Sequence, residues 1–342
     1  MSGISERKIK ILHAVVDEYI KNAEPVSSKG IQQKYLPELS PATIRSELSA
    51  LEDMGYLVQP HVSSGRVPSK MAYKLYVDKL MQKKNLSPAE IRHIKEYLDD
   101  KVVKVEDIVR RTAKVISDIT NYTSVILLKN VDSVIIREIR LVDLRDGTAL
   151  LIVITDSGII RDHVVSIPED MGDSYVNVAG DLLNNIFAGK QLADIEMPDE
   201  MIDGELNKFR SLFENVLELL KKNSTHDNGI YLEGSRKILD YPEYAEDIGK
   251  VRNLLEVIDT KEKLSALMEK DDEALSLKGS PIELTVKIDS DSNQADCSVI
   301  SAKYTVHGKE IGQVGVIGPT RMNYDKVVSV LNYITKTLNE DE

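Results

Sequence analysis

One stretch decides the fold of the N-terminal part of the chain: residues 40–55, SPATIRSELSALEDMG. Ser40 is an N-cap candidate, and Pro41 suits the first helical position because its missing N–H would have no partner there. Gly55 can end the helix in the left-handed conformation. The stretch therefore predicts one helix of about four turns. Its apolar stripe consists of Ile44, Leu48, Leu51 and Met54.

The opposite face of this helix is small, polar and cationic. Hydroxyl groups and a guanidinium can meet base edges and phosphates in the major groove of DNA. A solvated helix face is the plainer interpretation of this helix taken alone. The candidates for contacts with base edges are Thr43, Arg45, Ser46 and Ser49.

The residues before this helix strengthen the DNA-binding interpretation. Residues 5–22 predict an amphipathic helix, residues 27–35 a short second helix, and residues 36–39 a tight turn. Helix, short helix, turn and helix is the order of a helix-turn-helix, whose first elements lie along the DNA backbone. The candidates for phosphate contacts are Ser27, Ser28, Lys29 and Ser40.

The residues after the helix predict a wing. Residues 56–59 and 66–68 are short strand candidates on either side of a serine- and glycine-rich turn. Backbone N–H groups and one cation at such a turn can closely approach a phosphate or the minor groove. The wing candidates are Ser64, Gly65 and Arg66. Taken singly, His61 and Arg66 fit an ordinary hairpin equally well.

Ordered motifs at both ends of the chain resemble one known family. They are PVSSK at 25–29, SPATIR at 40–45, LEDMGYL at 51–57, QPH at 59–61, SGRVP at 64–68, YKLYVD at 73–78 and GVIGPTRMNY at 315–324. Together these motifs resemble the HrcA family of heat-inducible transcription repressors. The resemblance implies a winged helix-turn-helix DNA-binding domain over 1–82, a linker over 83–87, a discontinuous GAF-like α+β domain over 88–144 and 226–342, and an inserted dimerisation domain over 145–225.

The same resemblance implies partners. It implies a homodimer that binds a CIRCE-type inverted repeat in double-stranded operator DNA upstream of chaperone genes. It also implies the chaperonin GroEL as the partner that maintains repressor activity, with repression relieved by heat.

Charge is distributed unevenly along the chain. The net charge is −12, yet residues 1–84 carry 13 Lys and Arg against 9 Asp and Glu, and the remainder carries 31 against 47. This asymmetry predicts a basic DNA-binding part on an acidic body. Because the excess of positive charge is small, we expect specific binding to need two DNA-binding domains acting together.

Composition predicts a cytoplasmic protein that associates with the nucleoid when it is bound to its operator. No apolar run approaches the roughly 20 residues of a membrane span, and Cys297 is the single cysteine, so the chain cannot form an internal disulfide. With no Trp and 5% aromatic residues, we expect aliphatic cores.

The rest of the chain predicts an α+β protein. A helix is expected over 69–81. A long helix over 87–120, with a break near residues 99–100 as an alternative, fits either a coiled-coil arm or packing on a sheet. The apolar face predicted for 199–222 fits either a core or a subunit interface. Strands are expected at 123–129, 134–142, 149–155, 159–167, 231–234, 282–288, 296–307 and 310–317, and the other helices at 173–188, 243–258, 261–269 and 323–338.

No catalytic or metal-ligating pattern is present in the sequence. The six His residues are scattered, so neither a metal nor a cofactor is expected, and the protein is not predicted to be an enzyme. Gly312, Gly315 and Gly318 favour a glycine-rich hairpin over a phosphate loop. Arg321 fits either a lock between the last helix and the body or a partner contact. A ligand-responsive regulator and an assembly module remain as alternative functions.

Overall fold

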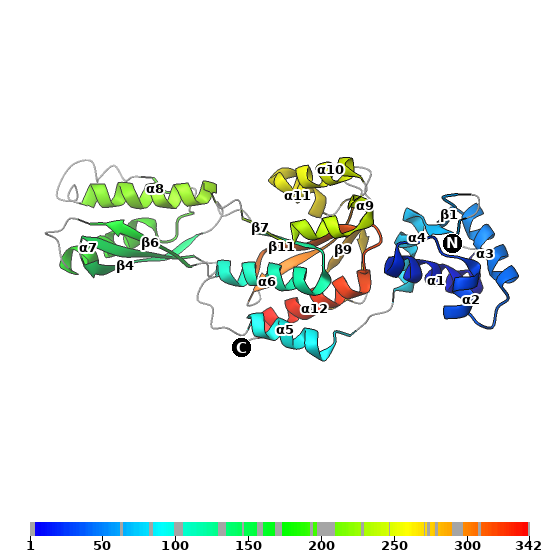
Figure 1. The fold of residues 1–342 in the computed structure, drawn as a ribbon. Coiled ribbons are helices and arrows are strands. Elements are labelled where there is room, and N and C mark those ends of the chain that lie inside the picture. Colours follow the sequence, from blue (N-terminus) through cyan, green and yellow to red (C-terminus); the bar gives the residue numbers. More distant parts are fainter. Residues whose placement is uncertain are drawn as a thin grey trace.

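The structure is a computed structural model, in which the described residues are 4–61, 64–81, 85–98, 105–128, 135–145, 147–155, 160–167, 173–191, 194–196, 209–226, 229–245, 247–269, 271, 274–277, 280–288, 297–306 and 309–340. Figure 1 shows three parts in a row. We call them the head (residues 4–81), the body (85–128 and 229–340) and the distal unit (135–226). The head and the distal unit lie at opposite ends of the row, with the body between them (Figure 1).

The head is a small helical fold with a two-stranded antiparallel sheet. The three helices predicted for residues 5–22, 27–35 and 40–55 and the two predicted strands are confirmed. The wing positions 62 and 63 lie outside the described residues. The elements are α1 (Glu6–Asn22), α2 (Ser28–Lys34), α3 (Pro41–Asp53), β1 (Leu57–Val58), β2 (Val67–Pro68), α4 (Lys70–Leu75) and the π-helix η1 (Tyr76–Leu80).

Helix α3 begins and ends through the expected local signals. The Ser40 hydroxyl accepts a hydrogen bond from the Thr43 backbone N–H at 3.1 Å, and Gly55 adopts a φ of 80°. Ile44, Leu48 and Leu51 are buried in the core of the head. Met54 was predicted as the fourth member of this stripe, and that prediction is wrong: Met54 is the C-cap residue and is 36% exposed.

The body is built on a six-stranded antiparallel sheet in the order β7-β3-β11-β10-β9-β8. The eight strands predicted after the head belong either to this sheet or to the sheet of the distal unit described below. Seven of them are observed within a few residues of their expected bounds, and the eighth, 134–142, is observed as the longer strand β4. The two-residue strand β8 was not predicted. The strands of this sheet are β3 (Thr123–Leu128), β7 (Ile230–Glu233), β8 (Leu275–Ser276), β9 (Leu284–Ile288), β10 (Cys297–Val306) and β11 (Lys309–Pro319).

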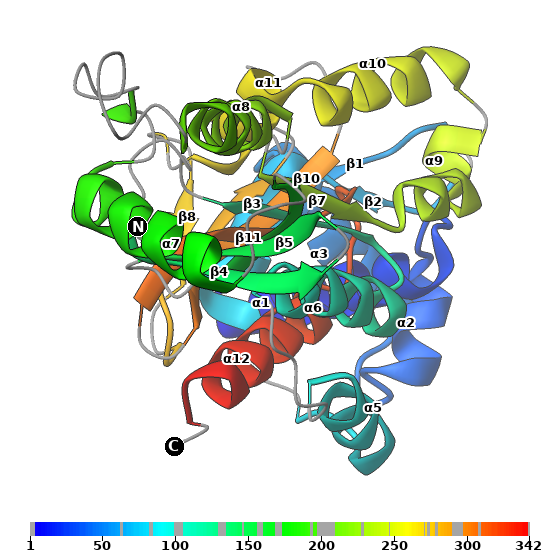
Figure 2. The same cartoon turned by 90° about the vertical axis from the view of Figure 1, so that its left-hand side faces the viewer.

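Helices cover both faces of this sheet. Helices α6 (Val105–Thr120) and α12 (Tyr324–Glu340) lie on one face, and α10 (Ile248–Asp259) and α11 (Lys261–Met268) on the other (Figures 1 and 2). The side chains of β3 alternate between the two faces of the sheet. Ile126 belongs to the core on the side of α6 and α12, and Val125 and Leu127 belong to the core on the side of α10 and α11. The short helix α9 (Pro242–Ala245) precedes α10.

The predicted helix 87–120 is two helices, α5 (Pro88–Leu98) and α6, and residues 99–104 lie outside the described residues. Val109, Ala113 and Ile116 of α6 are fully buried against the sheet core. Packing on the sheet is therefore the alternative that the structure supports for α6.

The distal unit has its own sheet, in the order β4-β5-β6. Strand β4 (Ile136–Arg145) pairs along its length with β5 (Thr148–Thr155), which pairs with β6 (Ile160–Ser166). The predicted boundary between residues 144 and 145 is therefore wrong, because β4 belongs to the distal unit. Helices α7 (Asp173–Phe187) and α8 (Arg210–His226) complete the unit. The residues between the strands predicted at 149–155 and 159–167, and the start of the helix predicted from residue 199, lie outside the described residues.

The apolar face of α8 belongs to a core. Phe213, Val216 and Leu220 are fully buried with inward-facing residues of the three strands and with α7. Of the two alternatives for this helix, core packing is therefore the one observed.

The opposite face of this sheet carries an apolar row next to the charged residues Arg140 and Asp162. Val142 on β4 lies opposite Leu150 on β5, which lies opposite Val164 on β6. Val142 is 46% exposed and Val164 is 62% exposed. A continuous exposed apolar row of this kind is typical of an interaction surface.

The glycines at 312, 315 and 318 all lie on β11, so the predicted glycine-rich hairpin is confirmed. A Cβ at Gly312 would lie 2.0 Å from the carbonyl oxygen of Leu127 on the neighbouring strand. At Gly318 it would lie 2.8 Å from the Tyr122 ring. These glycines permit close packing of the central strand.

Polar contacts join the head to the body. The Arg321 guanidinium pairs with Glu243 of the body and donates to the backbone carbonyl of Ile20, at the end of α1, at 3.2 Å. Arg321 therefore connects two segments of the body to each other and connects the body to α1 of the head. The Tyr76 hydroxyl donates to the Asp325 carboxylate at 3.1 Å in a buried position. Burial and the adjacent carboxylate raise the pKa of Tyr76, so this hydroxyl stays protonated and remains a donor.

Candidate nucleic-acid interface

Helix α3 presents a polar outer face with little free negative charge. Arg45, Ser46 and Ser49 are exposed, and Thr43 is half-buried. Glu47, within this helix, turns to α1 and pairs with Lys8 at 2.8 Å. Because α1 neutralises this carboxylate, it does not oppose the approach of a polyanion to α3.

Two of the three serines predicted to contact phosphates, Ser27 and Ser40, are helix caps, and Ser28 is the first residue of α2. Ser27 accepts a hydrogen bond from the Gly30 N–H at 3.1 Å, as Ser40 does from Thr43. Their hydroxyls fix the starts of α2 and α3, where backbone N–H groups point outward. Lys29 follows on α2 and is exposed, and within the described part of the chain no ion pair neutralises Lys29 or Arg45.

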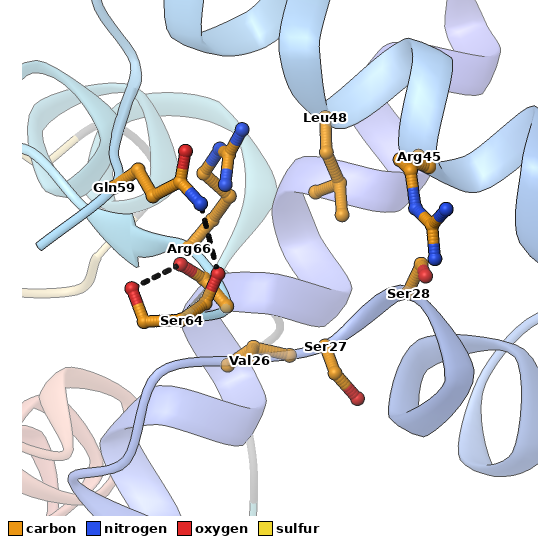
Figure 3. A pocket seen from close by; sticks show the side chains of 9 residues that line it. Val26, Ser27, Ser28, Arg45, Leu48, Gln59, Ser64 and Arg66 are labelled. Atoms are coloured by element: carbon orange, nitrogen blue, oxygen red, sulfur yellow. Dashed lines mark hydrogen bonds between the residues drawn. The ribbon is translucent and has the colours of Figure 1, made fainter. Parts of the chain in front are cut away.

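A cleft of about 370 Å³ lies between the start of α2, the outer side of α3 and the wing (Figure 3). Six of the predicted DNA-binding residues meet here, although they come from three separate segments. Ser40, Thr43, Ser46, Ser49 and Lys29 lie outside its lining. The lining residues are Val26, Ser27, Ser28, Arg45, Leu48, Gln59, Ser64, Gly65 and Arg66.

The wing side of the cleft is held by its own hydrogen bonds. The Ser64 hydroxyl donates to the His61 carbonyl at 2.7 Å and accepts from the His61 N–H at 3.0 Å. The Gln59 amide donates to the Ser64 carbonyl at 3.2 Å, as Figure 3 shows. Gln59 was not singled out from the sequence, and its place in the motif QPH is the only signal that could have pointed to it.

Gly65 has a structural role that the sequence did not reveal. Val26 and Arg66 exchange two backbone hydrogen bonds of 2.9 Å, which bring the wing against the chain that enters α2. A Cβ at Gly65 would lie 2.4 Å from the Val26 carbonyl oxygen. Gly65 therefore permits this close backbone approach.

We expect Gly65→Ala to destabilise the head by about 1 to 3 kcal/mol, because the added methyl group forces the wing away from Val26. Urea unfolding followed by circular dichroism measures this change. Gly30→Ala is the matched control, because a Cβ there meets only the Ser27 hydroxyl, at 3.3 Å. Equal unfolding free energies for the two variants would contradict the close approach.

Arg66 differs most from its expected position. It was predicted as the cation of the wing turn, but its Nη2 pairs with the Glu52 carboxylate of α3 at 2.7 Å and its side chain is only 17% exposed. Its Nε–H is buried without a hydrogen-bond partner among the described atoms. The sequence did not point to Glu52, because the ion pair forms only when the wing folds back onto α3.

The residues that the structure describes hold neither a metal-ligand cluster nor a membrane-spanning helix. No group of three or more His, Cys, Asp or Glu side chains there could hold a metal ion. No helix in the same residues has the length and apolar character needed to cross a membrane.

Comparison with known proteins decides the family. A family model for the HrcA protein C terminal domain matches residues 106–328. The chain is 37% identical to the heat-inducible transcription repressor HrcA of Symbiobacterium thermophilum over 98% of both chains. It is 36% identical to that of Pelotomaculum thermopropionicum, over 98% of this chain and 96% of the other. The chain belongs to the HrcA family.

HrcA family members are heat-inducible transcription repressors, so this protein is a DNA-binding regulator and not an enzyme. A crystal structure described as that of a hypothetical protein at 2.2 Å resolution is similar over 99% of this chain and 98% of its own length. Its TM-score is 0.76 at 20% sequence identity, which indicates a shared fold. Within the HrcA fold, the helical head and the sheet-based parts are thus common to both chains.

Proposed function

We propose that the head is a winged helix that reads operator DNA, with α3 in the major groove. The observation that supports this most is the cleft, because it brings residues of α2, α3 and the wing to one side of the head. In this proposal Thr43, Arg45, Ser46 and Ser49 contact base edges. Ser27, Ser28, Lys29 and Ser40 contact phosphates, and Ser64, Gly65 and Arg66 form the wing contact.

Two substitutions separate base reading from phosphate binding. Arg45→Ala is expected to cost about 1 to 3 kcal/mol on the operator and less on a scrambled duplex, since a base contact carries sequence information. Lys29→Ala is expected to weaken binding to both duplexes alike. Fluorescence anisotropy with labelled duplexes measures both. An equal loss on the two duplexes for Arg45→Ala would exclude its role as a base reader.

We further propose that the protein acts as a homodimer on a CIRCE-type inverted repeat. The outer face of the distal sheet supports this, because a two-fold dimer needs a self-complementary surface, and the row Val142, Leu150 and Val164 is apolar, with both valines exposed. In this proposal the distal unit is the inserted dimerisation domain, and the body is the GAF-like domain that carries each head. Two heads then read the two halves of the repeat.

The chaperonin GroEL completes the proposed function. A repressor with three separate cores and an exposed apolar row on its distal sheet presents apolar surface whenever it is partly folded, which is the surface that chaperonins capture. We expect GroEL with ATP to raise the operator-bound fraction after refolding from urea. An unchanged fraction would remove GroEL from the proposal and leave the operator contacts intact.

A further inference from the structure

The cleft between α2, α3 and the wing holds two cationic side chains of different character. Arg45 is exposed, and in Figure 3 its guanidinium extends toward Ser28. Arg66 is mostly buried and is held from behind by Glu52 of α3, which is not itself a lining residue. The cleft is therefore positively charged, and one of its two cations is fixed in place.

Arg66 lines the cleft and has hydrogen-bonding capacity that its contact with Glu52 does not use. A guanidinium carries five N–H donors. The Glu52 contact is made by Nη2, and Nε–H is buried without a partner among the described atoms. An unpaired buried donor is costly unless a ligand or water satisfies it. A guanidinium that is paired on one edge can still donate to an oxyanion from another.

The cleft is already formed around Arg66. Both backbone groups of Arg66 are bonded to Val26, and the Gln59 amide fixes the Ser64 carbonyl. These hydrogen bonds fix the backbone on either side of the Arg66 side chain, so the cleft wall that it forms is preorganised.

We infer that this cleft binds one phosphodiester of the DNA backbone, with Arg66 as its cation and Glu52 as the positioning residue that holds Arg66 and offsets part of its charge. The inference rests on the proposed function, because it assumes that DNA lies across α3 and the wing. It adds one defined site for a single phosphate and a role for Glu52, which the sequence showed only as part of the motif LEDMGYL.

The test uses the full-length protein and two labelled duplexes, an inverted-repeat operator and a scrambled duplex of equal composition. Arg66→Gln is expected to weaken binding to both duplexes by about tenfold at moderate salt. It is also expected to lower the slope of log affinity against log salt by about 1. Arg66→Lys, which keeps the charge, is expected to retain the slope.

Glu52→Gln is expected to strengthen binding to both duplexes by about threefold to tenfold, because Arg66 then presents its full charge. In the Arg66→Gln background the same change is expected to have no effect, because Glu52 acts through Arg66. Glu18→Gln is the matched control. It removes a carboxylate that pairs with Lys34, away from the cleft lining, and is expected to leave affinity close to that of the natural protein.

A DNA affinity that falls in Arg66→Gln and rises in Glu52→Gln distinguishes a phosphate site from an ion pair that only stabilises the wing. If the ion pair only holds the wing, both Arg66→Gln and Glu52→Gln weaken DNA binding and stability together, and the inference is wrong. It is also wrong if Glu52→Gln matches Glu18→Gln. Stabilisation by inorganic phosphate that needs Arg66, with DNA affinity unchanged in Arg66→Gln, would assign the cleft to a free anion. Failure of the natural protein to prefer the operator would instead overturn the proposed function.

Discussion

Val164→Glu is expected to convert the proposed dimer into monomers and to reduce operator affinity by about 100-fold or more. Val164 is the most exposed residue of the apolar row on the distal sheet, opposite Leu150 of β5. A carboxylate placed in an apolar interface is left without water and without a partner, which costs several kcal/mol. Losing the second head also removes the gain of about 10² to 10⁴ that comes from linking two binding sites.

Analytical ultracentrifugation and anisotropy on the same samples measure the two effects together. Val178→Glu is the matched control, because Val178 is 45% exposed and lies on α7 rather than on the outer sheet face. We expect Val178→Glu to remain dimeric. Dissociation by Val178→Glu with a stable dimer for Val164→Glu would place the interface on the helical side of the distal unit.

Gly312→Ala is expected to destabilise the body by about 3 kcal/mol or more, at the upper end of the range for overpacking substitutions. Gly312 lies on β11, opposite Leu128 of β3, near the middle of the six-stranded sheet. A Cβ there would lie 2.0 Å from the Leu127 carbonyl oxygen and 2.8 Å from the Leu128 Cα. Because both obstacles are backbone atoms, β3 and β11 must separate to admit the methyl group.

Urea unfolding of the full chain measures this loss. Gly180→Ala is the control, since a Cβ at Gly180 in helix α7 has its nearest neighbour at 3.6 Å. We expect that variant to be neutral or more stable by about 0.5 to 1 kcal/mol, because Ala favours a helix over Gly. An unfolding free energy for Gly312→Ala within about 0.5 kcal/mol of the natural protein, the usual range for surface substitutions, would contradict the packing of β11 on β3.

The head could be predicted closely from the sequence because its signals are local. Ser27, Ser40 and Ser69 each cap a helix through a hydrogen bond to a backbone N–H three residues later. Gly55 ends α3 with a positive φ, as expected. Each of these features depends on a few neighbouring residues, so a single sequence contains enough information to place it.

Features that depend on distant residues could not be predicted in the same way. Strand β4 was assigned to the body and not to the distal unit, because its periodicity indicates a strand but does not identify β5 as the neighbouring strand. The two-residue strand β8 is too short to produce a pattern. The apolar face of α8 was ambiguous until the structure placed it against the distal sheet.

The candidate site shows the same division between local and distant features. The sequence identified the polar face of α3 and the wing, because both follow from residue types and spacing. It did not show that Arg66 pairs with Glu52 or that Gly65 packs against Val26. Both contacts form between segments that meet only when the wing folds back onto the helices.

Binding of the full-length protein to an inverted-repeat chaperone-promoter duplex, compared with a scrambled duplex of equal composition at two salt concentrations, tests the central claim most directly. We expect a strong preference for the repeat that persists at the higher salt concentration, and a sharp loss of affinity when only one half-site is present. Equal affinity for the two duplexes at both salt concentrations, with GroEL present or absent, would contradict an operator-reading dimer.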